Sequence, residues 1–334
     1  MRVGINGMGR VGRAYLRRSL EIEDVEVAAV NDVTDVGILA HLLRHDSTFG
    51  SFPAEVRSIG DALVVGGHKI PVTAASLPAE IPWSEHDVHI VIESSGRFRS
   101  RDAAASHLDG GAGTVIVSAP GKGLDATIVL GVNDDAYDVK RHRIISNASC
   151  TTNCVAPMVK VLHEPFGVER GFMTTVHAYT NDQNVLDAPH PDPRRARAGA
   201  VNIIPTSTGA ARAVGDVLPE LAGRLDGISL RVPVTDGSMV DLGVLLDQSV
   251  STDDVNEAFA DAAAGPLAGL LRYADEPMVS SDVIFDSSSC VFDSQLTQAS
   301  GRLVKVFGWY DNEWGYACRL VDLTRLVGAA GEPI

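Results

Sequence analysis

One short segment of this sequence could carry covalent chemistry. From Ala148 to Cys154 it reads Ala-Ser-Cys-Thr-Thr-Asn-Cys, and it joins a predicted buried strand, residues 143–147, to a predicted helix. A cysteine in the first turn of a helix meets free backbone N–H groups and the positive end of the helix dipole, and both stabilise a thiolate. Cys150 is therefore a candidate nucleophile, with Ser149 and Thr151 as hydroxyl donors beside it. The alternative is an inert core thiol, as most free cysteines are.

His177 is the candidate base. It lies in an apolar run, residues 172–179, that predicts a strand and gives no packing reason for an imidazole. Most buried histidines only find a hydrogen-bond partner. If the fold brings His177 to Cys150, however, the imidazole would lower the pKa of the thiol and exchange protons with the substrate.

Arginines in an otherwise acidic chain indicate anion binding. Arg194, Arg195 and Arg197 lie in a loop rich in proline and arginine, residues 182–200, where surface solvation is an equally good explanation. Arg231 lies inside an apolar strand, where a guanidinium usually needs an anion such as phosphate. The segment 208–211, Thr-Gly-Ala-Ala, predicts the start of a helix that could hold a second anion.

The N-terminus predicts a dinucleotide site. A strand, residues 2–6, leads into a turn with Gly7, Gly9 and Gly12, then a helix, residues 13–20, and a strand that ends before Asp32. Glycines in that turn let the backbone approach a pyrophosphate at the helix N-terminus. A carboxylate at Asp32 accepts hydrogen bonds from ribose hydroxyls and repels a 2′-phosphate, which favours NAD over NADP. The alternative is an ordinary turn aspartate.

The remaining pattern predicts two domains with different sheets. Up to residue 149, strands alternate with helices, which is typical of a Rossmann-type, doubly wound parallel sheet. From residue 150 to 314 the pattern predicts an α+β catalytic domain with a largely antiparallel sheet, including a hairpin of residues 228–234 and 240–246. The predicted elements of the first part are strands at 88–93, 114–118 and 128–132 and a helix at 101–108. Those of the second part are strands at 172–179, 228–234, 240–246 and 303–310, a helix at 255–264 opened by a capping box at Ser251–Asp254, and a helix at 315–327.

Composition excludes several classes of protein. The 334 residues carry a formal net charge of −15, which argues against nucleic acid or an acidic membrane as partner. No apolar stretch is long enough to span a membrane, and the N-terminus does not read as a signal peptide, so we expect a cytoplasmic protein. Cys150, Cys154, Cys290 and Cys318 form neither a zinc spacing nor a disulfide framework, so we expect reduced thiols and no metal.

The motifs together resemble those of phosphorylating glyceraldehyde-3-phosphate dehydrogenases. The similarity runs from Ile5-Asn6-Gly7-Met8-Gly9-Arg10, through the segment around Cys150, to Trp309-Tyr310-Asp311-Asn312-Glu313. It implies NAD-dependent oxidative phosphorylation of D-glyceraldehyde 3-phosphate, a step of glycolysis, through a thiohemiacetal and a thioester on Cys150. It also implies a homotetramer, and a C-terminal helix, residues 315–334, that completes the NAD-binding domain.

The resemblance also implies a role for individual residues. Cys150 is the nucleophile and His177 the base. The substrate phosphate is assigned to Thr180, Arg195 and Arg231. The attacking inorganic phosphate is assigned mainly to Ser149, Thr151, Thr208 and Gly209. The cofactor is assigned to Asn6, Gly7, Gly9, Arg10, Val11, Asp32, Ser118 and Asn312. Departures from the family pattern are mild at Met8 and Ser207, whereas Ser76 replaces a basic residue that often packs on the adenine.

Two other functions remain open on the sequence. An erythrose-4-phosphate dehydrogenase would share the fold, nucleophile and base, although that relative often carries glutamate in place of Asp32. A catalytically idle regulatory paralogue would keep the scaffold, but the intact Cys150, His177, Arg195 and Arg231 argue against it. The sequence does not distinguish a main glycolytic enzyme from a second copy with altered sensitivity to thiol-alkylating inhibitors.

Overall fold

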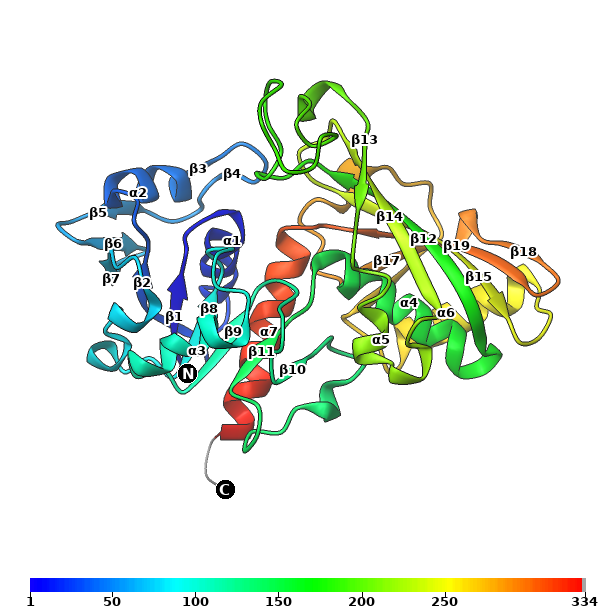
Figure 1. The fold of residues 1–334 in the computed structure, drawn as a ribbon, viewed down its shortest axis with the longest axis horizontal. Coiled ribbons are helices and arrows are strands. Elements are labelled where there is room, and N and C mark those ends of the chain that lie inside the picture. The colour runs from blue at the N-terminus through cyan, green and yellow to red at the C-terminus, as the bar shows by residue number, and fades with distance from the viewer. Residues whose placement is uncertain (332–334) are drawn as a thin grey trace. The chain divides into compact units, whose positions relative to one another are not determined.

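The computed structural model describes residues 1–331 and divides into two compact units. The first unit comprises residues 1–128, 135–148 and the chain from 317 onward, and the second comprises residues 129–134 and 149–316. Figure 1 follows the chain from the blue N-terminus to the red helix α7. Of the C-terminal segment predicted as residues 315–334, the last three residues, 332–334, lie outside the described part of the chain. Within residues 1–331, no helix is both long and apolar enough to cross a membrane.

The first unit is an α/β layer structure around one sheet. Its elements are β1 (Arg2–Asn6), α1 (Arg10–Ser19), β2 (Glu26–Asn31), α2 (Val36–Arg44), β3 (His45–Asp46), β4 (Gly50–Ser51), β5 (Val56–Ser58), β6 (Ala62–Val65), β7 (His68–Thr73), β8 (Ile90–Glu93), α3 (Arg101–Asp109), β9 (Thr114–Val117), β10 (Ala126–Thr127), β11 (Ile144–Ser146) and the greater part of α7 (Trp314–Gly331). The sheet order is β10-β11-β9-β8-β1-β2-β7-β6-β5. Pairing is parallel from β10 to β7 and antiparallel beyond it.

The strand order fixes where a ligand can bind in this unit. β1 leads to β2 on one side, and β8 lies on the other side of β1, so the chain reverses its direction of winding between β1 and β8. Ligands of such sheets bind at the carboxyl ends of the strands on either side of that reversal. Here those ends are Asn6 and Glu93, which pair with each other in the register.

Two details of the first unit differ from the sequence prediction. Residues 128–132 form no strand, because the pairing with β11 ends at Thr127 and the following residues turn. The segment 36–73, for which no element was predicted, supplies α2 and the five strands β3–β7. Its strands are two to six residues long, too short to leave a clear period in the sequence.

The second unit packs helices against a mixed sheet. Its elements are α4 (Cys150–Phe166), β12 (Val168–Ala178), β13 (Ile204–Ser207), α5 (Val214–Val217), β14 (Leu225–Val232), β15 (Ser238–Leu246), α6 (Thr252–Ala264), β16 (Leu271–Ala274), β17 (Cys290–Asp293), β18 (Gln298–Ser300) and β19 (Leu303–Tyr310). The order is β13-β14-β12-β15-β19-β17-β16, with β18 on β19. Pairing is antiparallel except for β12 with β14 and β16 with β17.

The predicted hairpin of β14 and β15 does not form. β12 lies between them, parallel to β14 and antiparallel to β15, because its eleven residues pair along both edges. The insertion matters for the site, since it places His177 of β12 directly opposite Arg231 of β14.

Two helix starts in this unit test local sequence signals. The capping box is present: the Ser251 hydroxyl accepts from Asp254 N, and the Asp254 carboxylate accepts from Ser251 N. The helix predicted to begin at Thr208 is wrong, because residues 210–213 form turns and α5 begins only at Val214.

Candidate functional site

Cys150 is the first residue of α4, as predicted. Ser149 caps the helix, and its hydroxyl accepts a hydrogen bond from Thr152 N at 3.0 Å. Ala148 precedes the cap with a positive φ of 55°, an uncommon conformation that alanine adopts at a cost. This sharp entry leaves Cys150 half-buried at the helix end, whereas Cys154, one turn later, is fully buried.

His177 faces this cysteine. Its Nε2 lies 3.5 Å from the Cys150 sulfur. On the other side of the ring, Nδ1 is 2.7 Å from the carbonyl oxygen of Ala178. The tautomer protonated on Nδ1 donates to that carbonyl and leaves a lone pair on Nε2 that faces the thiol, which is the geometry of a nucleophile and its base.

The pKa values of this pair differ from the sequence prediction, which had expected a lowered thiol pKa. Burial raises the pKa of Cys150 to about 11, although the positive charge of Arg231 and the hydroxyl and N–H of Thr151 oppose the increase. Burial, and then Arg231, lowers the pKa of His177 to about 3. Cys150 is only half-buried, so solvent offsets part of its desolvation. The resting pair is therefore a neutral thiol beside a neutral imidazole.

Arg231 is the cation of this site. Its Nη1 donates to the Ala178 carbonyl at 3.0 Å and lies 2.6 Å from His177 Nδ1. Because a guanidinium N–H only donates, this contact favours the His177 tautomer protonated on Nε2, and the catalytic tautomer requires that N–H to turn toward Ala178 alone. The Nε of Arg231 is buried and has no hydrogen-bond partner among the described residues. An unpaired guanidinium N–H can still donate a hydrogen bond to an anion such as phosphate.

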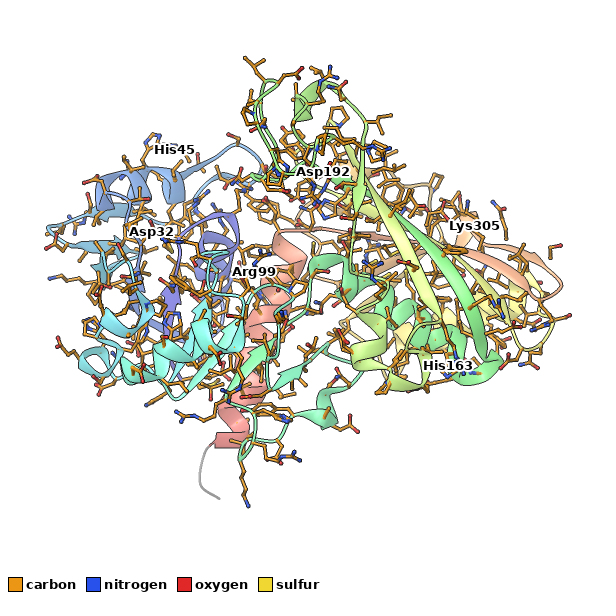
Figure 2. The ribbon with its side chains drawn as sticks, viewed as in Figure 1. Asp32, His45, Arg99, His163, Asp192 and Lys305 are labelled. Carbon is orange, nitrogen blue, oxygen red and sulfur yellow. The ribbon has the colours of Figure 1, made fainter. Side chains whose placement is uncertain are left out.

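Arg195 and Thr180 meet at a carboxylate that the sequence analysis did not single out. Asp182 accepts a hydrogen bond from the Thr180 hydroxyl and forms an ion pair with Arg195. Burial opposes the ionised form, but Thr180, Arg195 and Arg231 together lower the pKa of Asp182. Arg195 also donates to the hydroxyl of Thr206, which in turn donates to Asp192, the loop residue labelled in Figure 2.

Thr208 and Gly209 follow β13 directly. The Thr208 hydroxyl accepts from Ala210 N at 3.2 Å, and a Cβ added to Gly209 would meet no atom within 4 Å. Because the expected helix is absent here, an anion at this turn would meet individual N–H groups instead of a helix N-terminus.

The end of β19 contributes further polar side chains. Tyr310 bridges Thr151 and Thr175 through its hydroxyl, and it packs edge-on against the His177 ring. Asn312 Oδ1 accepts from the Ser238 hydroxyl at 2.6 Å, which fixes its amide orientation.

A pair of buried carboxyl groups, Asp236 and Asp311, lies near these residues and was missed by the sequence analysis. Each is at most 2% exposed. Burial first, and then the neighbouring Asp311, raises the pKa of Asp236. No sequence spacing links the two residues; an aspartate next to the glycine at 237 reads only as a turn.

A pocket of about 260 Å³ lies in the first unit at the carboxyl ends of β1, β2 and β8. Four predicted cofactor residues line it, namely Asn6, Gly7, Gly9 and Asp32, and so does Ser76. Asp32 accepts from Met8 N through one carboxylate oxygen and from Thr34 N through the other.

The glycines in this turn meet different requirements. Gly7 has φ +96°, and a Cβ there would lie 2.6 Å from the backbone of Ser95. Gly9 caps α1, and a Cβ there would meet nothing within 4 Å, so open space faces the helix N-terminus. That space at the helix N-terminus fits a pyrophosphate.

The other predicted cofactor residues of this unit lie beside the pocket. Arg10 and Val11 open α1, with Arg10 forming an ion pair with Asp46 at 2.6 Å. Ser118 follows β9, and both its N–H and its hydroxyl donate to the carbonyl oxygen of Glu93 at 3.0 Å.

Comparison with known proteins covers nearly the whole chain. Residues 1–101 match the family model for the NAD binding domain of glyceraldehyde 3-phosphate dehydrogenase, and residues 149–312 match the model for its C-terminal domain. The chain is 56% identical over 331 residues to glyceraldehyde-3-phosphate dehydrogenase 2 of Streptomyces arenae, covering 99% of both chains. It is 54% identical over 332 residues to the glyceraldehyde-3-phosphate dehydrogenase of Geobacillus stearothermophilus, again covering 99% of both.

Proposed function

Because the chain belongs to the glyceraldehyde-3-phosphate dehydrogenase family, we propose that it converts D-glyceraldehyde 3-phosphate to 1,3-bisphosphoglycerate with NAD and inorganic phosphate. The observation that carries the proposal is the 3.5 Å approach of His177 Nε2 to the Cys150 sulfur at the start of a helix. In this role the enzyme serves glycolysis, as the sequence resemblance implies.

Cys150 and His177 perform the covalent steps. The sulfur attacks the aldehyde carbon while its proton passes through His177 to the new hydroxyl oxygen, which gives a thiohemiacetal. His177 is neutral in the resting site, so it then takes the hydroxyl proton as hydride leaves the same carbon. NAD, when bound, supplies the hydride acceptor. The resulting thioester is cleaved by inorganic phosphate, which yields the acyl phosphate and returns the thiol.

Two sets of residues bind the two phosphates in this proposal. Thr180, Arg195 and Arg231 bind the substrate phosphate, which is supported by the partnerless Arg231 Nε. Because Asp182 now bonds both Thr180 and Arg195, a phosphate that binds them must displace its carboxylate or share its donors. Ser149, Thr151, Thr208 and Gly209 bind mainly the attacking phosphate.

NAD binding is assigned to the first unit. The open space over Gly9 takes the pyrophosphate, and Asp32 takes the adenosine ribose. The further cofactor residues in the proposal are Asn6, Gly7, Arg10, Val11, Ser118 and Asn312. The proposal also includes the domain division, with residues 1–149 and 315–334 binding NAD and residues 150–314 carrying the covalent chemistry.

A homotetramer in the cytoplasm completes the proposal. Large apolar side chains are exposed on the sheet of the second unit, including Phe172 at 74%, and on the long loop, including Val185 at 83% and Leu186 at 76%. Large contiguous patches of exposed apolar groups mark protein interfaces, so these side chains are the candidates for subunit contacts. A reducing compartment is required because the reaction needs Cys150 as a free thiol.

A phosphate-dependence assay tests the function. With glyceraldehyde 3-phosphate, NAD and inorganic phosphate, we expect continuous NADH formation; without phosphate, we expect a burst of about one NADH per chain followed by a stall. Cys150→Ser should abolish both phases. A faster rate on erythrose 4-phosphate would assign the chain to that relative instead, and the absence of any NADH would leave it a binding protein.

A further inference from the structure

A buried carboxylate, Glu93, lies behind the wall of the proposed NAD pocket. It ends β8 and is 2% exposed. Four groups donate to it: the Asn6 amide at 2.5 Å, His107 Nε2 at 2.9 Å, Ser95 N at 2.9 Å and the Ser95 hydroxyl. A buried carboxylate is costly unless donors surround it, so this arrangement has a strict requirement for correctly oriented N–H and O–H groups.

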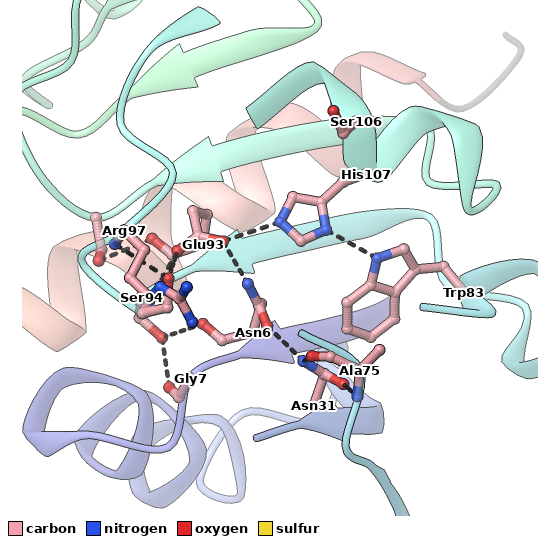
Figure 3. Close-up of polar contacts among 12 residues, drawn as sticks. Asn6, Gly7, Asn31, Ala75, Trp83, Glu93, Ser94, Arg97, Ser106 and His107 are labelled. Atoms are coloured by element: carbon pink, nitrogen blue, oxygen red, sulfur yellow. Dashed lines mark hydrogen bonds and ion pairs between the residues drawn. The ribbon is translucent and has the colours of Figure 1, made fainter. Parts of the chain in front are cut away.

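Trp83 sets the direction of the hydrogen bonds. Its indole N–H, which can only donate, points to His107 Nδ1 at 3.0 Å. Nδ1 must therefore accept, and the ring proton is on Nε2, where it is donated to Glu93. Trp83 and His107 are both 0% exposed, so bulk solvent does not reach either side chain. Figure 3 shows the continuous path from Trp83 through His107 and Glu93 to Asn6.

The path continues into the pocket wall. Because the Asn6 amide nitrogen donates to Glu93, its oxygen faces the other way and accepts from the Asn31 amide at 2.8 Å. Asn31 is held in turn by the backbone of Ala75, which donates to its oxygen at 2.9 Å and accepts from its nitrogen at 3.0 Å. Asn6, Asn31 and Ala75 all line the pocket.

The Glu93 carboxylate also binds Ser95, which lines the proposed NAD pocket on the side of the turn after β8. Its second oxygen accepts both the N–H and the hydroxyl of Ser95, and the Ser95 backbone packs directly against the Gly7 turn. Glu93 therefore joins the end of β1 to the turn after β8, the two places where the winding of the sheet reverses. His107 further supports this side of the pocket by packing edge-on under Phe98, with ring centroids 6.5 Å apart.

We propose that Glu93 and His107 are positioning residues for NAD, which hold Asn6 and the Ser95 turn in the orientation that the cofactor requires. The proposal rests on the proposed function. A purely structural role explains the network poorly, since replacing buried polar groups with well-packed apolar ones is often neutral or stabilising. The network instead fixes side chains and a turn that face a ligand pocket.

Glu93→Gln is the central test. The amide has nearly the same shape, but one of its ends becomes an NH₂ group that faces either the Ser95 donors or the Asn6 and His107 donors. We expect NAD binding, measured by calorimetry on the purified full-length protein, to weaken about tenfold or more, which corresponds to about 1.4 kcal/mol. The KM for NAD should rise by a similar factor, whereas kcat at saturating NAD should change by less than about threefold.

Two variants of His107 separate hydrogen bonding from packing. His107→Gln offers one acceptor to Trp83 and one donor to Glu93, so it should retain NAD affinity within about threefold. His107→Leu fills the space without a donor and should weaken NAD binding about as much as Glu93→Gln. Equal losses in both His107 variants would show that ring packing matters and would overturn the proposal.

Tyr15→Phe is the matched control. It removes another buried hydrogen bond of the same unit, between the Tyr15 and Thr324 hydroxyls at 2.9 Å, and neither residue lines the pocket. Its NAD affinity should stay within about twofold of the unmutated protein. The alkylation rate of Cys150 without NAD should be unchanged in every variant, because that cysteine belongs to the other unit.

The outcomes are distinct from those of the functional proposal. If Glu93→Gln binds NAD as tightly as the unmutated protein, or if Tyr15→Phe loses as much affinity as Glu93→Gln, the network only stabilises the fold and the inference is wrong. If the unmutated protein itself does not bind NAD, the proposed function fails instead.

Discussion

Replacement of Arg231 by leucine separates two roles that the geometry gives to one guanidinium. Leucine fills the place of the Arg231 side chain in β14 with apolar atoms. It removes both the proposed phosphate contact and the contact of Nη1 with His177 at 2.6 Å. A hydrogen bond to a charged group is worth about 1.5 to 3 kcal/mol, or roughly 10- to 150-fold in rate if it is fully expressed in the transition state. That loss should appear in kcat/KM for glyceraldehyde 3-phosphate.

Unphosphorylated glyceraldehyde isolates the second role. It never contacts Arg231 through a phosphate, so its rate reports only the effect on Cys150 and His177. The charge of Arg231 lowers the pKa of both groups, and its removal should raise the pKa of both. Since His177 acts as a base, the acid limb of the pH–rate profile should move to higher pH with either aldehyde.

NADH formation with the two aldehydes is the assay. We expect the loss in kcat/KM for Arg231→Leu to be at least about tenfold larger with glyceraldehyde 3-phosphate than with glyceraldehyde. Arg231→Lys keeps the positive charge but lacks the planar guanidinium group. Its kcat/KM for glyceraldehyde 3-phosphate should lie between those of Arg231→Leu and the unmutated protein. Equal losses with both aldehydes would refute the phosphate contact and leave Arg231 only as a partner of His177.

Four further predictions concern other residues. Asp32→Ala should narrow the preference for NAD over NADP about tenfold or more in kcat/KM, and equal use of both by the unmutated enzyme would contradict this. Cys150 should be alkylated before the buried thiols, at a rate that still rises above pH 9 and falls in His177→Asn; peptide mapping identifies the labelled residue. Thr208→Ala should slow the phosphate-dependent phase but preserve the first NADH burst, so a lost burst would place Thr208 in the first step. The pKa of Asp236 is raised in the folded protein, which therefore keeps a proton that the unfolded chain releases above about pH 4. The free energy of unfolding should then decrease as the pH rises from about 4 through the raised pKa. Asp236→Asn should therefore increase Tm more at pH 8 than at pH 5, and an equal gain at both would contradict the assignment.

Local signals explain what the sequence predicted well. The helix start at Cys150 follows from the Ser149 cap and the strand before it, all within a few residues. The capping box at Ser251 and Asp254 is equally local. Each of these features depends on short-range hydrogen bonds, which residue type and spacing largely determine.

Strand pairing between segments that are distant in the sequence explains what the sequence predicted poorly. The short connection through Thr235, Asp236 and Gly237 suggested a hairpin, but the sequence does not reveal that β12, which precedes β14 by about fifty residues, pairs between β14 and β15. The same insertion brings His177 beside Arg231, so the feature that defeats the hairpin prediction builds the site. The prediction of a helix start at Thr208 was wrong for a related reason. β13 extends to Ser207, and the chain forms turns before α5 begins at Val214.

Electrostatics depends on burial, which no short motif encodes. The sequence predicted a lowered thiol pKa from the helix N-terminus and the neighbouring imidazole, yet burial raises the pKa of Cys150 and lowers that of His177. A neutral thiol is a weaker nucleophile than a thiolate, so the pair cannot rely on a resting ion pair. It can rely on proximity, because a base 3.5 Å from the sulfur removes the proton as the bond to the aldehyde forms. Reactivity should then depend on the position of the His177 ring, which is held by the edge-on contact with Tyr310 and by the hydrogen bond to the Ala178 carbonyl oxygen.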